Sequence, residues 1–311
     1  MKSLVKFKYL ISVIVLFLVC FGLKALADAP SATISSAINK IDINQHQANV
    51  SYLLSIRNNA KVPQSFHLYI QDFGTLDESG GVAFLGVGQA GFSAKYGLAA
   101  WASIDKTDLT IDPLKAQTVK ITIKNNDSLS PGGHYGAVTV ESINPEAASQ
   151  ASKIQLNRII SSLIFLRKVG GEIYALSLKQ VDFAHSLFTV PGKVKLEFYN
   201  PGNVHVTPRG VVTVKDPFGR IVKKGIINED SGIILPETNR IYPTNLKSLA
   251  LVFWPGKYQI TTQFRYDDQA RYLTVINNYY YLNPFFILLL LLIAVAIIYT
   301  IFKLKSKLSK S

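Results

Sequence analysis

Residues 193–225, KVKLEFYNPGNVHVTPRGVVTVKDPFGRIVKKG, decide the fold class of this chain. Apolar and polar side chains alternate in residues 193–199, which is the pattern of a strand with one buried face. Residues 200–203 (NPGN) are typical of a turn. Residues 216–219 (DPFG) are typical of a hairpin, in which proline presets one backbone angle and glycine supplies a positive one. The stretch predicts short strands joined by tight turns.

The same pattern continues on both sides of this stretch, from Asp28 to Leu282. Short runs rich in β-branched and aromatic residues are separated by turn signals, and no amphipathic helix stands out. Residues 153–167 form a long apolar stretch that fits either a closing strand or a short helix, and we favour a strand. Further predicted strands include Asn49–Arg57, Gln64–Gln71, Gln117–Lys124, His134–Glu141, Lys257–Tyr266 and Arg271–Tyr279. The segment is therefore predicted to be all-β.

The two halves of this segment repeat one plan. RNNA at 57–60 precedes an alternating strand, as YNPGN at 199–203 does. PGGHY at 131–135 and PGKY at 255–258 each lead into a strand with an early tyrosine. Chance similarity between β-rich segments is the alternative explanation. With a boundary near Gly170-Gly171, the repeat predicts two tandem Ig-like β-sandwiches, residues 28–170 and 171–282.

The C-terminus contains an uncharged run from Phe285 to Phe302. A helix of about 20 residues spans a hydrocarbon core of about 30 Å. We predict a transmembrane helix at 283–302 and a basic cytoplasmic tail at 303–311, the alternative being a buried helix of a soluble domain. The predicted membrane-interface residues are Tyr279, Tyr280, Tyr281, Lys303, Lys305 and Lys307, because tyrosines suit the headgroup level and lysines mark the cytoplasmic end of a span.

The N-terminus has the layout of a secretory signal. Lys2, Lys6 and Lys8 precede an apolar run, and Ala25-Leu26-Ala27 suits signal peptidase. We predict a signal peptide at 1–27, with an uncleaved signal anchor as the alternative. Together the two ends predict a single-pass protein of the cell membrane with an extracellular ectodomain.

Cysteine usage and charge narrow the class of protein. Cys20 is the only cysteine and lies in the predicted signal, so the mature chain folds without disulfides, which suits a bacterial surface. The net charge is +13, but eight lysines belong to the predicted signal and tail, leaving +5 for the ectodomain. Its basic residues are scattered among strands, whereas a nucleic-acid binder clusters them. We expect no nucleic-acid partner.

The sequence offers little catalytic chemistry. It has no HExxH, CxxC, GxSxG or phosphate-binding glycine loop, and its five histidines lack metal-ligand spacing. The adjacent acids at 77–78, 229–230 and 267–268 lie in predicted loops and point different ways, unlike the paired acids of a glycosidase. We predict no enzyme activity, no cofactor and no metal site.

Exposed aromatic residues are the better binding candidates. Residues 73–97 form an apparent loop insertion with seven glycines, and loops on a rigid scaffold often carry binding residues. Planar rings at such a place stack on sugars or form interface hot spots, although packing under their own loop is the alternative. The candidates for partner binding are Phe84, Phe92, Tyr96 and Trp101.

A family resemblance adds to this reading. Residues 198–206 (FYNPGNVHV), together with Arg209-Gly210 and DPFGR at 216–220, resemble the second extracellular domain of bacterial WxL-interacting surface proteins. PGGHYGAV at 131–138 resembles the end of their first domain. The resemblance implies two Ig-like domains, one transmembrane helix and a non-catalytic surface role. It further implies a first domain associated with peptidoglycan and a second that contacts WxL-type or host proteins.

Three functions follow as hypotheses. The first is a non-catalytic, membrane-anchored surface protein whose two domains bind cell-wall polymer or a partner surface protein. The second is a structural subunit of a membrane-bound surface or secretion assembly, which would use the same sandwich surfaces. The third, a wall-modifying hydrolase, requires acids that converge in one cleft. The ligand, the oligomeric state and the role of residues 73–97 do not follow from the sequence.

Overall fold

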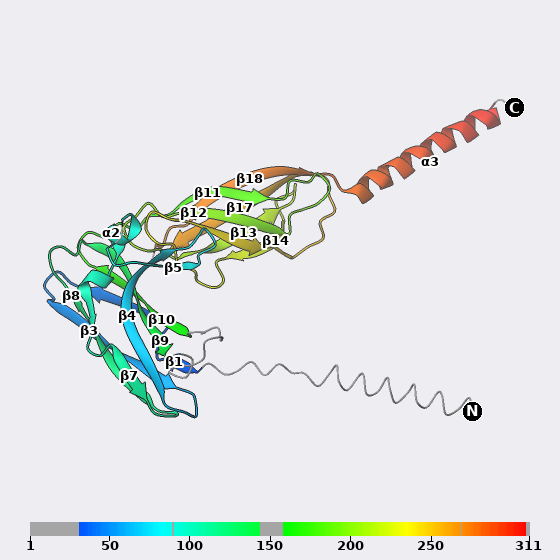
Figure 1. Cartoon of the computed structure of the whole chain (residues 1–311). Coiled ribbons are helices and arrows are strands. Elements are labelled where there is room, and N and C mark those ends of the chain that lie inside the picture. Colours follow the sequence, from blue (N-terminus) through cyan, green and yellow to red (C-terminus); the bar gives the residue numbers. More distant parts are fainter. Residues whose placement is uncertain (1–30, 89, 144–157, 268, 309–311) are drawn as a thin grey trace, which may run out of the picture.

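The computed structural model describes residues 31–88, 90–143, 158–267 and 269–308. It contains two β-sandwich domains and one C-terminal apolar helix, α3 (Pro284–Leu308) (Figure 1). The predicted fold class is therefore confirmed. The predicted signal peptide lies outside the described residues and stays a prediction.

The first domain packs two sheets face to face. One has the strand order β1-β3-β8-β6, and the other has the order β2-β10-β9-β4-β5, with β7 also paired to β4. The strands are β1 (Ala32–Ile34), β2 (Ile38–Ile43), β3 (Asn49–Asn58), β4 (Gln64–Thr75), β5 (Val82–Leu85), β6 (Ala102–Ile104), β7 (Asp108–Ile111), β8 (Ala116–Lys124), β9 (Gly132–Ile143) and β10 (Ile159–Lys168). Most neighbours are antiparallel, but β2 runs parallel to β10.

The second domain is a smaller sandwich. Its two sheets have the orders β11-β12-β15 and β16-β14-β13-β17-β18. The strands are β11 (Ser177–Phe183), β12 (Lys193–Tyr199), β13 (Pro208–Lys215), β14 (Ile221–Ile227), β15 (Asn239–Asn245), β16 (Lys247–Ser248), β17 (Gly256–Tyr266) and β18 (Leu273–Tyr281). The predicted hairpin at 216–219 joins β13 to β14. Gly219 adopts a φ of 81° there, a value that glycine accepts without strain.

Alternation along the strands builds the two cores. Val119, Ile121 and Ile123 of β8 are fully buried in the first core, and Val194 and Leu196 of β12 are fully buried in the second. Their polar neighbours point outward, as the sequence predicts for half-buried strands. The apolar stretch at 153–167 resolves as β10 from Ile159 onward, so the strand is confirmed there and residues 153–157 lie outside the described residues.

The repeated turns have the same geometry in both domains. Asn58 ends β3 and Asn200 follows β12, and both side chains are fully buried. The side-chain oxygen of each accepts the N–H of the residue two positions later, and the amide donates to the carbonyl four positions later. Each asparagine therefore closes its turn from the inside, which explains why the sequence motif recurs.

The glycine-rich segment 73–97 is more ordered than the loop that its composition predicts. Its start extends β4 to Thr75, β5 pairs back onto β4, and α2 (Phe92–Tyr96) follows. The segment packs against the second domain, where the Ile241 N–H donates to the Glu78 carbonyl at 2.7 Å and Lys95 forms an ion pair with Glu237. The segment therefore forms part of the domain junction, and the partner-binding role of its aromatic residues stays a prediction.

An apolar cluster holds the two domains together. Phe73, Tyr135 and Phe165 of the first domain pack with Leu235 of the second, and all four are buried. The Tyr135 hydroxyl accepts the backbone N–H of His205 at 2.8 Å, and Gly133 donates to the Asn203 carbonyl at 2.8 Å. The junction thus has both apolar packing and hydrogen bonds, which fix the angle between the domains (Figure 1).

The helix α3 projects from the end of the second domain that is far from the first (Figure 1). Residues 284–305 are long and apolar enough to cross a membrane, and none of that span is buried against the rest of the protein. A buried helix of a soluble domain would show the opposite, so this alternative does not fit the structure.

Candidate functional site

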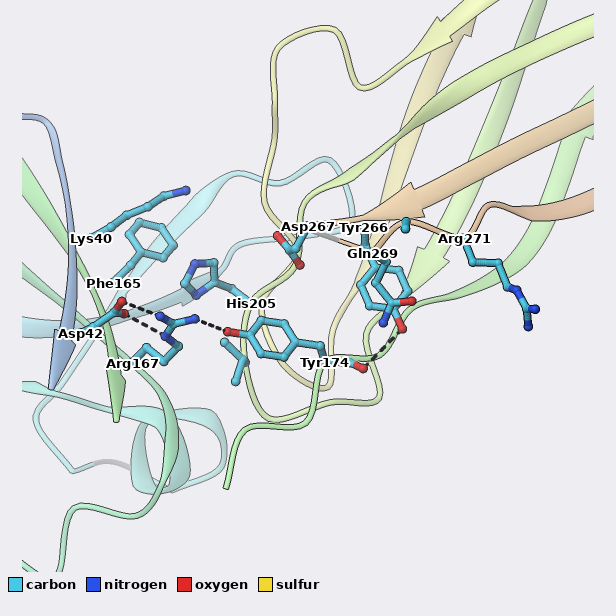
Figure 2. Close-up of a pocket in the computed structure, with 12 residues that line it drawn as sticks. Lys40, Asp42, Phe165, Arg167, Tyr174, His205, Tyr266, Asp267, Gln269 and Arg271 are labelled. Carbon is cyan, nitrogen blue, oxygen red and sulfur yellow. Dashed lines mark hydrogen bonds and ion pairs between the residues drawn. The ribbon is translucent and has the colours of Figure 1, made fainter. Parts of the chain in front are cut away.

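A cavity of about 790 Å³ lies between the two domains. Lys40, Asp42, Phe165 and Arg167 line it from the first domain (Figure 2). The second domain and the segment leading into it contribute Tyr174, Val204, His205, Tyr266, Asp267, Gln269, Ala270 and Arg271. The wall is mixed in character, with aromatic rings, both signs of charge and polar side chains.

The parallel pairing of β2 with β10 forms the first-domain wall. Lys40 lies opposite Phe165, and Asp42 lies opposite Arg167. Side chains of a strand alternate between faces, so these four share the face toward the second domain. Ile41 and Ile43 of β2 lie on the opposite face and pack in the first core. The sequence INKIDI at 38–43 carries this alternation, but our sequence interpretation did not recognise it as a strand.

Arg167 is held in a fixed orientation. Its Nε donates to Asp42 Oδ1 at 2.8 Å, a second guanidinium nitrogen donates to Asp42 Oδ2, and Nη1 donates to the Tyr174 hydroxyl at 2.6 Å (Figure 2). The hydrogen bonds to Asp42 and then to Tyr174 raise the pKa of Arg167. The guanidinium therefore stays charged, and its charge is largely balanced by Asp42.

Lys40 is the second cation of this wall, and unlike Arg167 it is not held by any acidic side chain that the structure describes. It is exposed, and the structure shows no hydrogen bond or ion pair for its ammonium group among the described residues. A flexible ammonium beside a cavity can bind an anionic group that enters it. Arg271 lies across the cavity, on the side of the second domain (Figure 2).

His205 lies in the centre of the junction as a neutral ring. Burial, followed by the nearby charges of Lys40 and Arg167, lowers the pKa of His205 to about 4. Its ring lies 5.1 Å from the Phe165 ring and 5.8 Å from the Tyr135 ring, between their centroids. It therefore extends the aromatic wall and adds no charge at neutral pH.

The outer edge of β2 is open. Leu163 donates to the Ala37 carbonyl and Val169 to the Ile43 carbonyl, so the odd-numbered residues of β2 direct their backbone groups to β10. The backbone N–H and C=O groups of Ile38, Lys40 and Asp42 point to the other edge of β2. There the Ser36 hydroxyl donates to the Ile38 carbonyl. No strand among the described residues pairs with that edge. It presents backbone donors and acceptors at the rim of the cavity.

A second, smaller cavity of about 220 Å³ adjoins the same wall. Ile38 and Leu163 line it from the first domain, and Ile233 and Leu235 line it from the second. Phe165 lines both cavities. The smaller cavity is mainly apolar near Ile38, although Asp230 and Arg240 also line it, whereas charged side chains line the larger cavity near Lys40.

The candidate aromatics from the sequence do not line the larger cavity. Phe92 and Tyr96 pack in the domain junction, and the Tyr96 hydroxyl donates to Glu237. Trp101 packs against the first core and donates its indole N–H to the Ser128 hydroxyl at 3.2 Å. Phe84 is 45% exposed on β5. Of the four, Phe84 presents the most open surface.

The predicted membrane-interface residues divide into two groups. Tyr279 and Tyr281 belong to β18 and are buried in the second core, because β18 runs on past the predicted end of the strand. Tyr280 between them is 64% exposed. Lys303 and Lys305 are exposed on the last turns of α3, and the side chain of Lys307 lies outside the described residues.

The structure does not assemble the acids of the hydrolase hypothesis. Asp267 lines the larger cavity and Asp230 the smaller one, while Asp77 bonds to its neighbour Ser79 in an exposed turn. Among the described residues, no group of three histidine, cysteine or acidic side chains is placed to hold a metal ion.

No family model and no curated protein matches this sequence. Similar solved structures include a chaperone–tip adhesin complex of CFA/I fimbriae, with 12% identity, a TM-score of 0.44, and coverage of 80% of this chain and 98% of that chain. The YadV chaperone has 14% identity, a TM-score of 0.37, and coverage of 80% and 99%. The Escherichia coli chaperone DraB has 13% identity, a TM-score of 0.36, and coverage of 79% and 97%.

These findings correct two expectations. The resemblance to WxL-interacting proteins is wrong, because the similar structures are fimbrial chaperones with two β domains. The function drawn from it, a membrane-anchored protein that binds cell-wall polymer or a partner surface protein, is contradicted with it. The similarity concerns the fold and assigns no ligand to this chain.

Proposed function

We propose that this chain is a membrane-tethered polypeptide-holding protein, a chaperone in the broad sense. Its interdomain cleft would receive an extended segment of an exported polypeptide that ends in, or carries, a carboxylate. The open edge of β2 carries the proposal: it runs from the mainly apolar pocket at Ile38 to the ammonium of Lys40, which has no partner among the described residues. The role involves no catalysis.

The chemistry of the edge fits a peptide. An extended segment added to a free strand edge gains main-chain hydrogen bonds, and pockets for alternate side chains provide specificity. The two cavities beside β2 would serve as such pockets, the smaller one mainly apolar and the larger one lined by several charged side chains. Two similar structures are described as chaperone–adhesin complexes, and our proposal rests on the cleft and not on that likeness.

The charges of the cleft favour an anionic terminus. Arg167 is already paired with Asp42, whereas Lys40 has no such partner among the described residues. His205 is neutral at physiological pH and leaves this balance unchanged. A carboxylate placed beside Lys40 would also lie near the Arg167 guanidinium, and charge-assisted hydrogen bonds to both would stabilise it.

The helix α3 would hold this cleft at a membrane. We propose the boundaries 1–27 for a signal peptide, 28–170 and 171–282 for the domains, 283–302 for the span and 303–311 for the tail. Lysines that follow a span mark its cytoplasmic end, so both domains would lie on the opposite side. An exported polypeptide would meet the cleft as it leaves the membrane.

A peptide-binding measurement tests the proposal. The full-length chain in nanodiscs is titrated with fluorescent peptides of about nine residues, which alternate valine and threonine to favour extension and end in a free or an amidated carboxyl group. The free carboxylate should bind about tenfold more tightly, because charge-assisted hydrogen bonds contribute about 1.5 kcal/mol or more. Lys40→Gln should remove this difference.

Lys120→Gln is the matched control, since Lys120 is an exposed strand lysine on β8, away from the cleft. It should leave both affinities unchanged. Equal binding of the two peptides to the native chain, or an equal loss in both lysine variants, would refute the proposed site.

A further inference from the structure

The end of the second domain next to α3 exposes a group of large apolar side chains. They come from the β11–β12 loop, the β13–β14 hairpin, the loop before β17 and the residue that follows β18. We call this group the apolar foot: Leu187 (51% exposed), Phe188 (55%), Phe218 (66%), Leu251 (80%), Trp254 (41%) and Leu282 (40%). Apolar side chains this exposed and this close together mark a binding surface.

Hydrogen bonds tie these loops to the beginning of α3. The Leu282 N–H donates to the Leu187 carbonyl at 2.5 Å. Asn283 is buried; its side-chain oxygen accepts the Phe285 N–H and so caps the helix, while its amide donates to the Phe253 carbonyl at 2.6 Å. The helix therefore starts from a fixed point on the domain and not from a flexible linker.

Aromatic contacts place the foot level with the first turn of the helix. The Phe286 ring of α3 lies 5.8 Å from the Phe253 ring and 6.0 Å from the Trp254 ring, between centroids. Phe218 lies 5.7 Å from Trp254, and the Arg220 guanidinium lies 5.9 Å from the Phe218 ring. The foot thus surrounds the point at which the apolar helix leaves the domain, with a cation at its margin.

This position identifies the partner. The apolar surface of α3 begins at Phe285, which is 76% exposed, so the hydrocarbon region of any bilayer that α3 spans begins at the same level. Side chains in contact with Phe286 then lie in the headgroup region, where tryptophan is favoured and where apolar side chains insert by about 5–10 Å. A water-exposed foot would instead leave all six apolar side chains solvated.

We infer that the apolar foot inserts into the interface of the bilayer that α3 spans, so that three loops as well as the helix hold the second domain on the membrane. The inference rests on the membrane anchoring in the proposed function, but not on the peptide-binding role. Its consequence is a defined orientation, because contacts spread around the helix resist tilting of the domain.

The two tryptophans of the chain allow a direct test. Trp101→Phe leaves Trp254 as the only tryptophan, and Trp254→Phe leaves Trp101 in the first domain. The full-length variants are reconstituted in phosphatidylcholine vesicles with lipids brominated at shallow or deep acyl positions. Trp254 fluorescence should be quenched, and more strongly by the shallow label, whereas Trp101 should not be quenched. Trp254 emission that is insensitive to both labels would overturn the inference.

A third variant separates the foot from the anchor. Tyr299→Trp in a chain without the two native tryptophans reports on α3 itself. Quenching of residue 299 without quenching of Trp254 would refute the foot alone. An unquenched residue 299 would show that α3 does not span the bilayer, which would refute both the anchor and the foot while leaving the peptide-binding test unaffected.

Substitutions within the apolar foot provide a second test of its insertion into the bilayer. Phe188→Ser with Leu251→Ser changes two exposed side chains, so the domain should fold, and the quenching of Trp254 should fall by about half or more as the foot leaves the interface. Leu53→Ser with Val62→Ser is the control, because these exposed side chains lie in the first domain. Quenching that persists unchanged in the foot variant would argue against the inference.

Discussion

At the residue scale, two buried asparagines and the half-buried His205 show how single side chains define this molecule. Asn58 and Asn200 occupy equivalent turns, and the buried side-chain amide of each donates to two backbone carbonyls that hold the turn closed. His205 is kept neutral between the domains. Burying a polar group without a hydrogen-bond partner, or a charge without a counter-charge, costs free energy. Few other residue types could therefore replace these three side chains.

The turn asparagine gives the first prediction. Asn200→Ala should lower the free energy of unfolding of the second domain by about 2 kcal/mol, because the Val204 carbonyl loses the Asn200 amide and the Gly202 N–H loses its acceptor, while the Ile234 carbonyl keeps the Val206 N–H. Urea unfolding of the detergent-solubilised chain in a Trp101→Phe background, followed by Trp254 fluorescence, measures the change. Asn44→Ala, at an exposed position, should change it by less than about 0.5 kcal/mol.

The histidine gives a pH prediction. A folded pKa of about 4, below the ordinary value of 6.5, means that the unfolded state binds a proton first as pH falls. The stability contributed by neutral His205 is therefore complete above pH 6.5 and declines as pH falls toward 4. Thermal unfolding between pH 7 and 5 should show this decline, and His205→Gln should reduce it. His46→Gln, at an exposed loop position, should follow the native chain; an identical decline in all three proteins would contradict the assignment.

At the element scale, β2 determines the chemistry of the cleft. Its inward residues complete the first core, and its outward residues carry Lys40 and Asp42. The backbone N–H and C=O groups of its odd-numbered residues form hydrogen bonds with β10, and those of its even-numbered residues face the open edge. A single short strand thus serves both packing and the proposed binding.

Proline substitutions separate these two roles. Lys40→Pro removes an N–H that faces the open edge, whereas Ile41→Pro removes one that pairs with β10. The first variant should fold normally, and the second should be strongly destabilised, which circular dichroism on heating measures. Lys40→Pro should also bind the free-carboxylate peptide about threefold to tenfold more weakly than Lys40→Ala does. Both variants lack the ammonium charge, but only the proline variant lacks the backbone N–H of residue 40. Equal affinities would show that no strand is added at this edge.

At the scale of the whole molecule, the domain junction and the helix base set the geometry. The junction joins Phe73, Tyr135 and Phe165 to the second domain, and the segment 73–97 reinforces it from one side. At the opposite end, Asn283 fixes the start of α3. The cleft is therefore held at a defined place relative to the proposed membrane.

Loosening the junction should divide the molecule into two folding units. Tyr135→Phe leaves the half-buried His205 N–H without its acceptor, which costs about 1–3 kcal/mol at the junction. We expect one calorimetric transition for the native chain and two for this variant. Lys95→Ala removes an exposed ion pair with Glu237 and a cation–π contact with Tyr96, both at the surface, and should leave a single transition. A single transition in the Tyr135 variant would mean that the apolar packing alone couples the domains.

The sequence by itself determined the features that depend on near neighbours. The alternating strands, the hairpin with Gly219, the paired asparagine turns and the apolar helix all follow from contacts within a few residues or from length and composition. These signals are local, so they can be recognised without knowing what lies opposite. For the same reason they predicted two β-sandwiches without predicting how the sandwiches meet.

Only the tertiary structure decided the cleft, the junction and the foot. Arg167 meets Asp42 across 125 positions of the sequence, and Tyr135 meets His205 across 70. The tyrosine run, which resembles a membrane belt in the sequence, alternates between core and surface because β18 extends through it. Whether a side chain faces a core, a cavity or a lipid surface depends on which distant strand packs against it, and local sequence patterns do not contain that information.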